Sequence, residues 1–371
     1  MLSEKPMKIT DKIWKPFPMG AIFVILPGKR LEKINMIPGS IPFVGSSDRN
    51  NGITAYCGNM NESLDANVLG LNYNGSVCEA FYHPYMCLFS DDVKRLKLAE
   101  YENNKYVLLF IGTCIKQQKV KYMYSYKFNE KRMRSQYILL PTRHTGEPDY
   151  EFMESFVKEM IAKKIKLYRD YTERQVKLGG GGGDCAKCAE WKSFSMAEIF
   201  EIGHGFYNKK PPCAGGDIPF VGASASNNGV TGWTTLEEVQ TYSKTGHLPN
   251  EPIERKLFHG GTIAVVNNGN PGYSYYQPSL YTSTHDVNPL TLRHRKMTPE
   301  LAMFLIPMVQ AQGVCFEYSR KWRPKRMVRS RFLLPVNKRG EPDWEYMEAC
   351  GRQMVLKKYR QYLDFLNSRN G

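Results

Sequence analysis

Two segments rich in lysine and arginine carry the side chains of this sequence that are best suited to binding a polyanion. In residues 127–134, and again in residues 320–331, cations alternate with aromatic and polar residues. A lysine or arginine neutralises a phosphate, and arginine also donates two hydrogen bonds to a guanine edge. One such run would be explained as a solvated surface loop, but its recurrence favours DNA. The candidate contacts are Lys127, Lys131, Arg132, Arg134, Lys321, Arg323, Lys325, Arg326 and Arg329.

A second candidate set is polar and lies around two Asn-Asn-Gly tripeptides. Asparagine reads an adenine edge through two hydrogen bonds, and exposed loops are where base readout occurs. Asn-Asn-Gly is equally good turn chemistry and needs no function, so both interpretations stay open. The residues of this set are Ser46, Ser47, Asn50, Asn51, Ser224, Asn227 and Asn228.

Neither DNA methylation nor metal-dependent cleavage is predicted for this chain by itself. A DNA amino-methyltransferase needs a polar residue before its Pro-Pro pair, whereas Pro211-Pro212 follows Lys210. The two Pro-Asp pairs precede predicted helices, so capping explains Asp149 and Asp343 better than metal binding. Residues 254–256 (Glu-Arg-Lys) have the acid-x-Lys half of a nuclease pattern without the Pro-Asp before it. We therefore expect no catalytic residue in this chain.

Length and composition predict two folded domains and a polyanionic partner. The chain has 371 residues, of which 42% are hydrophobic, and this is enough for two ordinary cores. Its 51 Lys+Arg against 36 Asp+Glu give a net charge of +15, which favours a nucleic acid or an anionic membrane surface. No basic amphipathic helix, lipidation signal or membrane-spanning run is found, so the membrane is disfavoured.

Cysteine usage and the N-terminal residues predict a cytoplasmic protein. The nine cysteines are an odd number at irregular spacing, which is typical of reduced thiols rather than a disulfide framework. The polar stretch MLSEKPMKITDK lacks the apolar run of a secretory signal. Cys185 and Cys188 form the one close pair, and a zinc site needs a second pair. We expect no metal and no cofactor in this chain.

The sequence contains two copies of one domain. A Trp-Lys-x-Phe motif recurs at an offset of 177 residues (191 − 14), as do Ile-Pro-Phe-Val-Gly and Asn-Asn-Gly. Later motifs, Lys-Arg-Met, Leu-Leu-Pro and Gly-Glu-Pro-Asp, recur at an offset of 194 (327 − 133). So many motifs in one order indicate a duplication. The change of offset predicts an insertion of 17 residues (194 − 177) in the second copy, around Thr235–Pro252.

Each copy predicts the same order of elements: short strands, a helix, the basic segment, a strand ending in Leu-Leu-Pro, and a long helix. The fold class expected is α+β, with two tandem α/β domains. The predicted early strands lie at 41–44, 67–71 and 80–81, and at 218–221, 262–266 and 273–276; the helices lie at 103–117 and 298–312, and the late strands at 138–141 and 332–335.

A long amphipathic helix closes each copy, with apolar residues at i, i+3, i+4 and i+7. One such stripe ordinarily packs on its own domain, but two equivalent stripes at the ends of two copies favour pairing of the helices with one another. The residues expected to pack are Met153, Phe156, Met160, Ile161, Met347, Met354, Val355 and Tyr359. Five glycines between the copies predict a flexible hinge.

The ordered, duplicated motifs resemble those of the DNA-specificity (S) subunits of type I restriction-modification systems, and of the similar subunits of type IIB enzymes of the BcgI kind. The likeness covers Trp14 to Leu366 and is specific through motif order rather than through any single motif. It implies two target recognition domains (1–148 and 185–342) that each read half of a split double-stranded DNA site. It also implies two spacer helices (149–178 and 343–371) that pack antiparallel, with the hinge at 179–184.

The resemblance also implies partners. Methyltransferase (M) subunits would dock on the helices and bring S-adenosylmethionine and the catalytic loop, and a nuclease subunit would join or be fused to M. This chain would then be a non-catalytic subunit. The short spacer helices and the glycine hinge depart from the usual type I pattern and favour a compact, type IIB-like layout. The alternative is a stand-alone duplicated DNA-binding protein, such as a regulator or an antirestriction factor, without an M partner.

Overall fold

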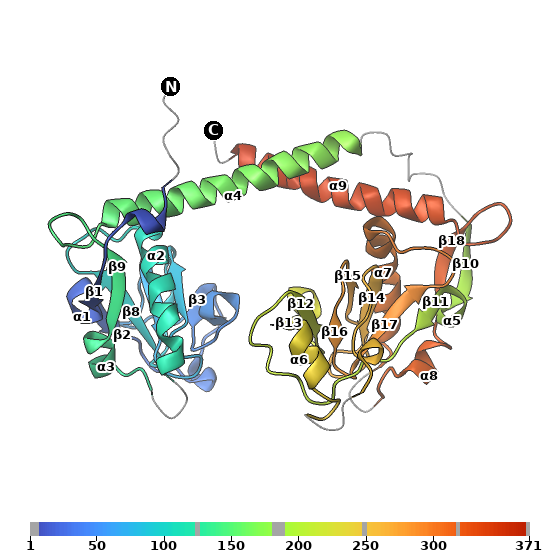
Figure 1. The fold of residues 1–371 in the computed structure, drawn as a ribbon, viewed down its shortest axis with the longest axis horizontal. Coiled ribbons are helices and arrows are strands. Elements are labelled where there is room, and N and C mark those ends of the chain that lie inside the picture. The colour runs from blue at the N-terminus through green and yellow to red at the C-terminus, as the bar shows by residue number, and fades with distance from the viewer. Residues whose placement is uncertain (1–6, 123–126, 180–189, 247–250, 317–319, 369–371) are drawn as a thin grey trace. The chain divides into compact units, whose positions relative to one another are not determined.

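The computed structural model describes residues 7–122, 127–179, 190–246, 251–316 and 320–368. The chain divides into two compact units, Met1–Tyr168 and Arg169–Gly371. Both units combine short strands with helices (Figure 1). The mixed α and β content agrees with the predicted fold class. Residues 180–184 of the predicted glycine hinge, and the cysteine pair at 185 and 188, lie outside the described residues.

The first unit contains three small sheets. A four-stranded sheet has the order β2-β8-β5-β6, a three-stranded sheet has the order β4-β3-β7, and β1 pairs with β9. The strands are β1 (Trp14–Pro18), β2 (Phe23–Pro27), β3 (Ile41–Val44), β4 (Ile53–Cys57), β5 (Val68–Asn72), β6 (Ala80–His83), β7 (Leu88–Phe89), β8 (Val93–Leu98) and β9 (Tyr137–Pro141). The helices are α1 (Met19–Ile22), α2 (Lys105–Lys116), α3 (Glu130–Ser135) and α4 (Tyr150–Leu178).

The second unit repeats this topology sheet by sheet. Its sheets have the orders β11-β17-β14-β15, β13-β12-β16 and β10-β18, and the bulge between Phe43 and Val44 recurs between Phe220 and Val221. The strands are β10 (Glu190–Ser195), β11 (Phe200–Ile202), β12 (Ile218–Val221), β13 (Val230–Thr234), β14 (Thr262–Val266), β15 (Ser274–Gln277), β16 (Thr282–Ser283), β17 (Val287–Leu292) and β18 (Arg331–Val336). The helices are α5 (Met196–Ile199), α6 (Leu236–Thr241), α7 (Pro299–Gly313), α8 (Pro324–Met327) and α9 (Trp344–Ser368). The predicted duplication is confirmed, and α6 lies in the predicted insertion.

Capping residues and an apolar face explain where the central helices α2 and α7 form. Asn104 accepts hydrogen bonds from the backbone N–H groups of Tyr106 and Val107 at the start of α2. Thr298 caps α7 in the same way, and Pro299 occupies the first turn. Both helices bury one face in the core of their unit. Gly112 lets α2 approach the sheet closely, because a Cβ there would lie 3.3 Å from the Leu69 side chain.

The predicted caps of the two long helices are confirmed. The Asp149 carboxylate accepts a hydrogen bond from the backbone N–H of Phe152 (3.0 Å), and Asp343 accepts one from Tyr346 (3.0 Å). Asp149 also pairs with Lys12 at 2.7 Å. Desolvation would raise the pKa of Asp149, but Lys12 and the helix N–H outweigh it and hold that pKa below its usual value. Neither aspartate therefore needs a metal to explain its position.

The buried faces of the long helices differ from the predicted stripes. Met153, Phe156 and Ile161 pack on the first core and Met347 on the second, so each lies against the core of its own domain, whereas the prediction was that the two helices pair through these residues. Met160 and Met354, however, are 48% and 44% exposed. On α9, Gly351 lies directly against α7, where a Cβ would lie 1.9 Å from the Glu300 carbonyl.

Close backbone contact at this glycine brings α9 against α7. The buried positions on α9 are Met347, Gly351, Leu356 and Leu366. The predicted stripe was built from large side chains, so it did not include Gly351. On α4, Phe152 is buried instead of Met160, because the first turns of the helix already cover the core of the first unit.

The last turns of α4 belong to the second unit and contact α9 there. The rings of Tyr171 and Tyr359 meet edge to face with centroids 5.8 Å apart, and their hydroxyl oxygens are 3.3 Å apart. Gly179 lies against the side chain of Leu356. From Tyr171 to Gly179 the residue number rises, while that of the contacted residue on α9 falls from Tyr359 to Leu356. The two segments are therefore antiparallel within the unit. Val355 lies beside the same contact.

Six described cysteines carry free thiols, namely Cys57, Cys78, Cys87, Cys114, Cys213 and Cys315. Cys350 on α9 is disulfide-bonded, so the expectation of reduced thiols does not hold at this position. Within the described ranges, no helix is long and apolar enough to cross a membrane.

His83 makes the first unit sensitive to acid. It is fully buried on β6 against Phe89, with ring centroids 5.3 Å apart, and neither of its ring nitrogens has a hydrogen-bond partner among the described residues. Burial lowers the pKa of His83 from 6.5 to about 4. Between these values only the unfolded chain binds the proton, so stability falls as the pH drops below about 6.5.

We therefore expect the first unit to lose about 2 kcal/mol of unfolding free energy between about pH 7 and pH 5 from this group. Its equivalent in the second unit is Gln277, whose amide donates to the Asn228 carbonyl at 3.0 Å. His83→Gln should abolish this part of the pH dependence in urea unfolding at the two pH values. An equal loss in the wild type and in His83→Gln would show that other groups cause it.

Candidate nucleic-acid interface

The two Asn-Asn-Gly tripeptides form the same left-handed turn between paired strands. Asn50 and Asn51 have φ of 51° and 53°, and Asn227 and Asn228 repeat these values. Asparagine tolerates this region better than other residues with a Cβ. Asn51 donates to the Tyr82 carbonyl (3.3 Å). Asn228 donates to the equivalent carbonyl of Tyr276 (2.9 Å). The second asparagine of each pair therefore holds the turn on a neighbouring strand.

The first asparagine of each pair stays the better candidate for reading a base. Asn50 and Asn227 are exposed at the tips of the turns. Asn50 donates only a 3.2 Å bond to the Ile53 carbonyl, which leaves its amide oxygen available. A base-reading role for either residue stays a prediction.

The serines of the polar set support the turns. The Ser46 hydroxyl donates to the Asn74 carbonyl, and the Ser47 hydroxyl accepts from the Arg49 N–H at 3.1 Å. The Ser224 hydroxyl accepts from the Ser226 N–H at 3.2 Å. These are local side chain-to-backbone bonds of the kind that shape turns.

Each basic segment is a short helical turn anchored by two buried side chains. Phe128 and Met133 are fully buried in the first unit, as Trp322 and Met327 are in the second. An arginine closes each turn by donating to the carbonyl at the start of the segment. This bond runs from Arg132 to Lys127 and from Arg326 to Lys321, at 2.7 Å in both units. These two arginines therefore shape the segment whether or not they also contact a phosphate.

The two basic segments differ in how their cations are paired. In the first unit Glu130 accepts hydrogen bonds from Arg134, at 2.9 Å in the closest contact, and lies 3.5 Å from Lys94. These cations lower the pKa of Glu130 and keep it charged, with the Arg134 hydrogen bond as the largest cause. The equivalent of Glu130 in the second unit is Pro324, which cannot pair. Lys127, Lys131, Arg323, Lys325 and Arg329 are exposed.

In the second unit the basic segment forms one wall of an open groove of about 1080 Å³. The β17 end contributes His285, Asp286 and Asn288, and the loop after β11 contributes residues 204–206. Six lysine and arginine side chains line the groove against two carboxylates, so its field is positive with both histidines neutral. The lysines and arginines are Lys244, Arg255, Lys321, Arg323, Lys325 and Arg326, and the carboxylates are Glu254 and Asp286.

Lys244 and Arg255 were not predicted as site residues, although Lys244 lies in the predicted insertion and Arg255 follows its end by three residues. The insertion itself was the available signal, because extra residues in one copy mark a place where the two copies differ in function. In the sequence, Arg255 drew notice only as the middle residue of the acid-x-Lys pattern at 254–256. The structure places its neighbour Lys256 in the core and Arg255 on the groove.

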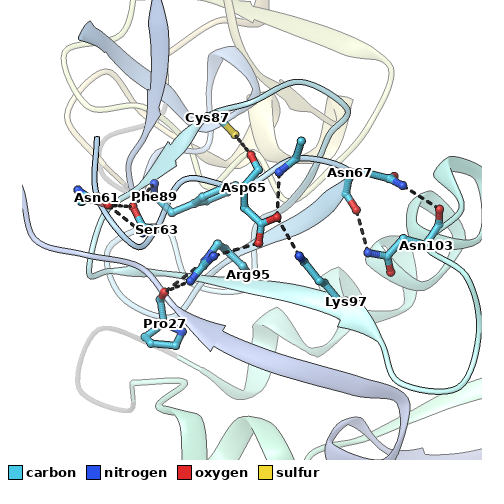
Figure 2. Close-up of polar contacts among 11 residues, drawn as sticks. Pro27, Asn61, Ser63, Asp65, Asn67, Cys87, Phe89, Arg95, Lys97 and Asn103 are labelled. Carbon is cyan, nitrogen blue, oxygen red and sulfur yellow. Dashed lines mark hydrogen bonds and ion pairs between the residues drawn. The ribbon is translucent and has the colours of Figure 1, made fainter. Parts of the chain in front are cut away.

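The first unit holds the equivalent connection with a buried charge network (Figure 2). Asp65, between β4 and β5, accepts from Arg95 and from Lys97, both at 2.9 Å. The Arg95 guanidinium also donates to the Pro27 carbonyl at 2.8 Å. In the second unit Pro289 takes the place of Arg95 opposite β14. The two units therefore share a scaffold and differ in the charged groups on it.

Within the described ranges, no three histidine, cysteine, aspartate or glutamate side chains are grouped so as to hold a metal ion. What the arrangement offers is cationic surface on turns and short helices of a rigid sheet scaffold, which is suited to phosphate binding and base readout. A tandem pair of α/β domains with such surfaces defines a two-domain nucleic-acid-binding protein.

Comparison with known families agrees with this class. The type I restriction modification DNA specificity domain matches residues 12–167 and 189–361, which is one match for each copy. The chain belongs to this family and carries its domain twice.

Individual relatives match to different extents. The chain is 58% identical over 157 residues to the Type II restriction enzyme BgcI specificity subunit S.BcgI of Heyndrickxia coagulans. That match spans 42% of this chain and 46% of the relative, so less than half of each is aligned.

Two solved structures align along most of the chain. The S subunit of the type I restriction-modification system from M. genitalium aligns over 98% of this chain and 96% of its own, with 13% identity and a TM-score of 0.44. The HsdS subunit from Thermoanaerobacter tengcongensis aligns over 100% and 94%, with 13% identity and a TM-score of 0.29. At these TM-scores neither alignment contributes to the family assignment.

Proposed function

We propose that the chain binds a bipartite double-stranded DNA site, with one half read by each unit. The observation that carries the proposal is the pair of DNA specificity domains with one topology and unlike charged surfaces. Like scaffolds place two reading surfaces in equivalent ways, and unlike side chains give each surface its own sequence preference. On the groove of the second unit, Arg323 and Lys325 have no ion-pair partner among the described residues, whereas Arg134 of the first basic segment pairs with Glu130, and this difference supports the proposal.

We further propose that the chain recruits a methyltransferase subunit and a nuclease subunit, either separate or fused, and acts in the cytoplasm. The similarity to a specificity subunit of a type II restriction enzyme supports this assignment. S-adenosylmethionine would bind the methyltransferase, which would flip the target adenine out of the duplex. This chain would supply the address and no catalytic group.

Sequencing of methylated adenines in DNA exposed to the chain with its methyltransferase tests both proposals. We expect methylation at one split sequence in the complex and none with the chain alone. Specific binding to DNA without co-purification or stimulation of a methyltransferase would favour the stand-alone DNA-binding protein. Methylation or cleavage by the isolated chain would show that it is an enzyme.

Paired variants test the assignment of one half-site to each unit. Asn50→Gly and Asn227→Gly keep the left-handed backbone and remove one amide each. If these amides read bases, each variant should lower discrimination at one position of one half-site by about 1–3 kcal/mol, and leave the other half unchanged. Methylation of duplex libraries randomised in each half measures this. A change in both halves with either variant would contradict the two-unit assignment.

A further inference from the structure

The inserted segment of the second unit reaches the groove that the basic segment lines. We use this name for the enlarged connection between β13 and β14, which contains the predicted insertion, forms α6 and returns through residues 251–256 to β14. Lys244 and Arg255 from this segment line the groove together with Arg323 and Lys325. The first unit has no such segment, because its β4–β5 connection is shorter. The groove of the second unit therefore carries two cations, Lys244 and Arg255, from a segment that the first unit lacks.

The start of the inserted segment is fixed by strong local caps. The Thr235 hydroxyl accepts from the Glu238 N–H at 3.1 Å, and the Glu238 carboxylate accepts from the Thr235 N–H at 3.3 Å. This is a capping box. A hydrogen bond from Thr234 at 2.6 Å is the largest cause that lowers the pKa of Glu238. Val239, a residue of α6, is fully buried. The start of the segment, through α6, is thus an ordered part of the domain.

Its end is fixed by a buried lysine. The Lys256 ammonium donates to the carbonyls of Val239, Gln240 and Tyr242 at 3.0, 3.3 and 2.8 Å. These carbonyls lie at the C-terminus of α6, where the helix dipole favours a cation. The Tyr207 hydroxyl donates to the Val239 carbonyl at 3.2 Å. Desolvation lowers the pKa of Lys256, and the carbonyls compensate for the water that it has lost.

The anchored end places Lys244 where its side chain reaches the groove. The Lys244 carbonyl accepts from the Asn208 N–H at 2.9 Å, and its own N–H donates to the Glu251 carboxylate at 3.1 Å. Lys244 follows Tyr242 by two residues, so the position of its backbone depends on the contact made by Lys256. Lys244 and Arg255 have no ion-pair partner among the described residues, which leaves both charges for a ligand.

We propose that the inserted segment is a second DNA-binding arm of this groove, which binds backbone phosphates through Lys244 and Arg255 and is held in place by Lys256. This inference rests on the proposed function and deepens it. The ligand class is the phosphate backbone of duplex DNA at the half-site read by the second unit. Binding of that half-site should consequently depend more steeply on salt than binding of the half-site read by the first unit.

The experiment measures the affinity of the full chain for short duplexes that carry one half-site each, over a range of salt. Lys244→Gln with Arg255→Gln should reduce the slope of log K against log salt by about 2 on the second half-site. Affinity there should fall by a factor on the order of 50 at about 0.1 M salt, and affinity for the first half-site should not change. The matched control is Lys296→Gln with Lys338→Gln, which removes two exposed cations of the same unit outside the groove.

The role of Lys256 as a positioning residue is tested by coupling. Lys256→Met should reproduce the loss of slope on the second half-site, and should add nothing when combined with Lys244→Gln and Arg255→Gln. A merely structural role would add its effect to theirs on the second half-site. If Lys256→Met does not fold, Tyr207→Phe removes another hydrogen bond to the same helix end and should lower the slope to a smaller extent.

The outcomes separate the two proposals. If the wild type binds neither half-site specifically, the proposed function is wrong. If it binds both but the double variant keeps the wild-type slope on the second half-site, only the arm is disproved. A control pair that lowers the slope as much as Lys244→Gln with Arg255→Gln would also disprove the arm, because the effect would then reflect net charge.

Discussion

Replacing Arg323, Lys325 and Arg329 together by glutamine is expected to weaken binding of duplex DNA by a factor on the order of 10² to 10³ at about 0.1 M salt. All three are exposed cations of the second basic segment, and none has an ion-pair partner among the described residues. If each neutralises one phosphate, the slope of log K against log salt should fall by about 2.7. Fluorescence anisotropy with a labelled duplex, titrated at several salt concentrations, measures both quantities.

The matched control for this variant removes the same charge elsewhere on the unit. Lys296, Lys338 and Arg339 are exposed and lie in loops outside the groove. Their replacement by glutamine should change the slope little. Equal losses in the two triple variants would show that only the net charge of +15 matters, and would remove the basic segment from the interface.

Replacing Asp65 by asparagine is expected to lower the unfolding free energy of the first unit by about 3 kcal/mol or more. The side chains of Arg95 and Asp65 are only 8% and 11% exposed, so the substitution leaves a buried guanidinium without its counter-charge (Figure 2). The Pro27 carbonyl still accepts from Arg95, but a neutral acceptor does not compensate a buried charge. Urea unfolding measures the loss.

Lys97→Met is the matched control, because Lys97 contacts the same carboxylate from a 38% exposed position. Its loss should be under about 1 kcal/mol, as for other solvated ion pairs. Amide hydrogen exchange locates the effect: protection in β5 should fall in Asp65→Asn, whereas protection in β14 of the second unit should not. Equal losses for Asp65→Asn and Lys97→Met would show that burial does not set the strength of this network.

Much of the secondary structure could be predicted from local pattern. Strands β3, β12 and β14 begin and end where the runs of apolar residues do, and both long helices begin directly after the aspartate caps. Strand β8, in contrast, was not predicted. Its sequence, Val-Lys-Arg-Leu-Lys-Leu, carries three cations, and the buried one, Arg95, is paired with Asp65 from a distant part of the chain. No window of sequence contains that pairing.

The positions of the candidate segments could be predicted from the sequence, but the hydrogen-bond partners of their side chains could not. The basic segments and the Asn-Asn-Gly turns recur at equivalent places, as the repeat requires. Composition did not reveal that Asn51 and Asn228 turn inward to neighbouring carbonyls, or that Arg132 and Arg326 close their own segments. A side chain that is able to contact DNA is equally able to support a loop, and the choice depends on which carbonyl lies within reach.

The sequence by itself determined that one domain occurs twice, that each copy ends in a capped amphipathic helix, and that the second copy carries an insertion. These properties follow from repeats, caps and periodicity, which are local in the chain. Only the tertiary structure decided that Lys256 is buried and Lys244 and Arg255 line a groove, and that Gly351 sets the contact of α9. Burial and charge pairing depend on residues far apart in sequence, so the fold alone assigns them.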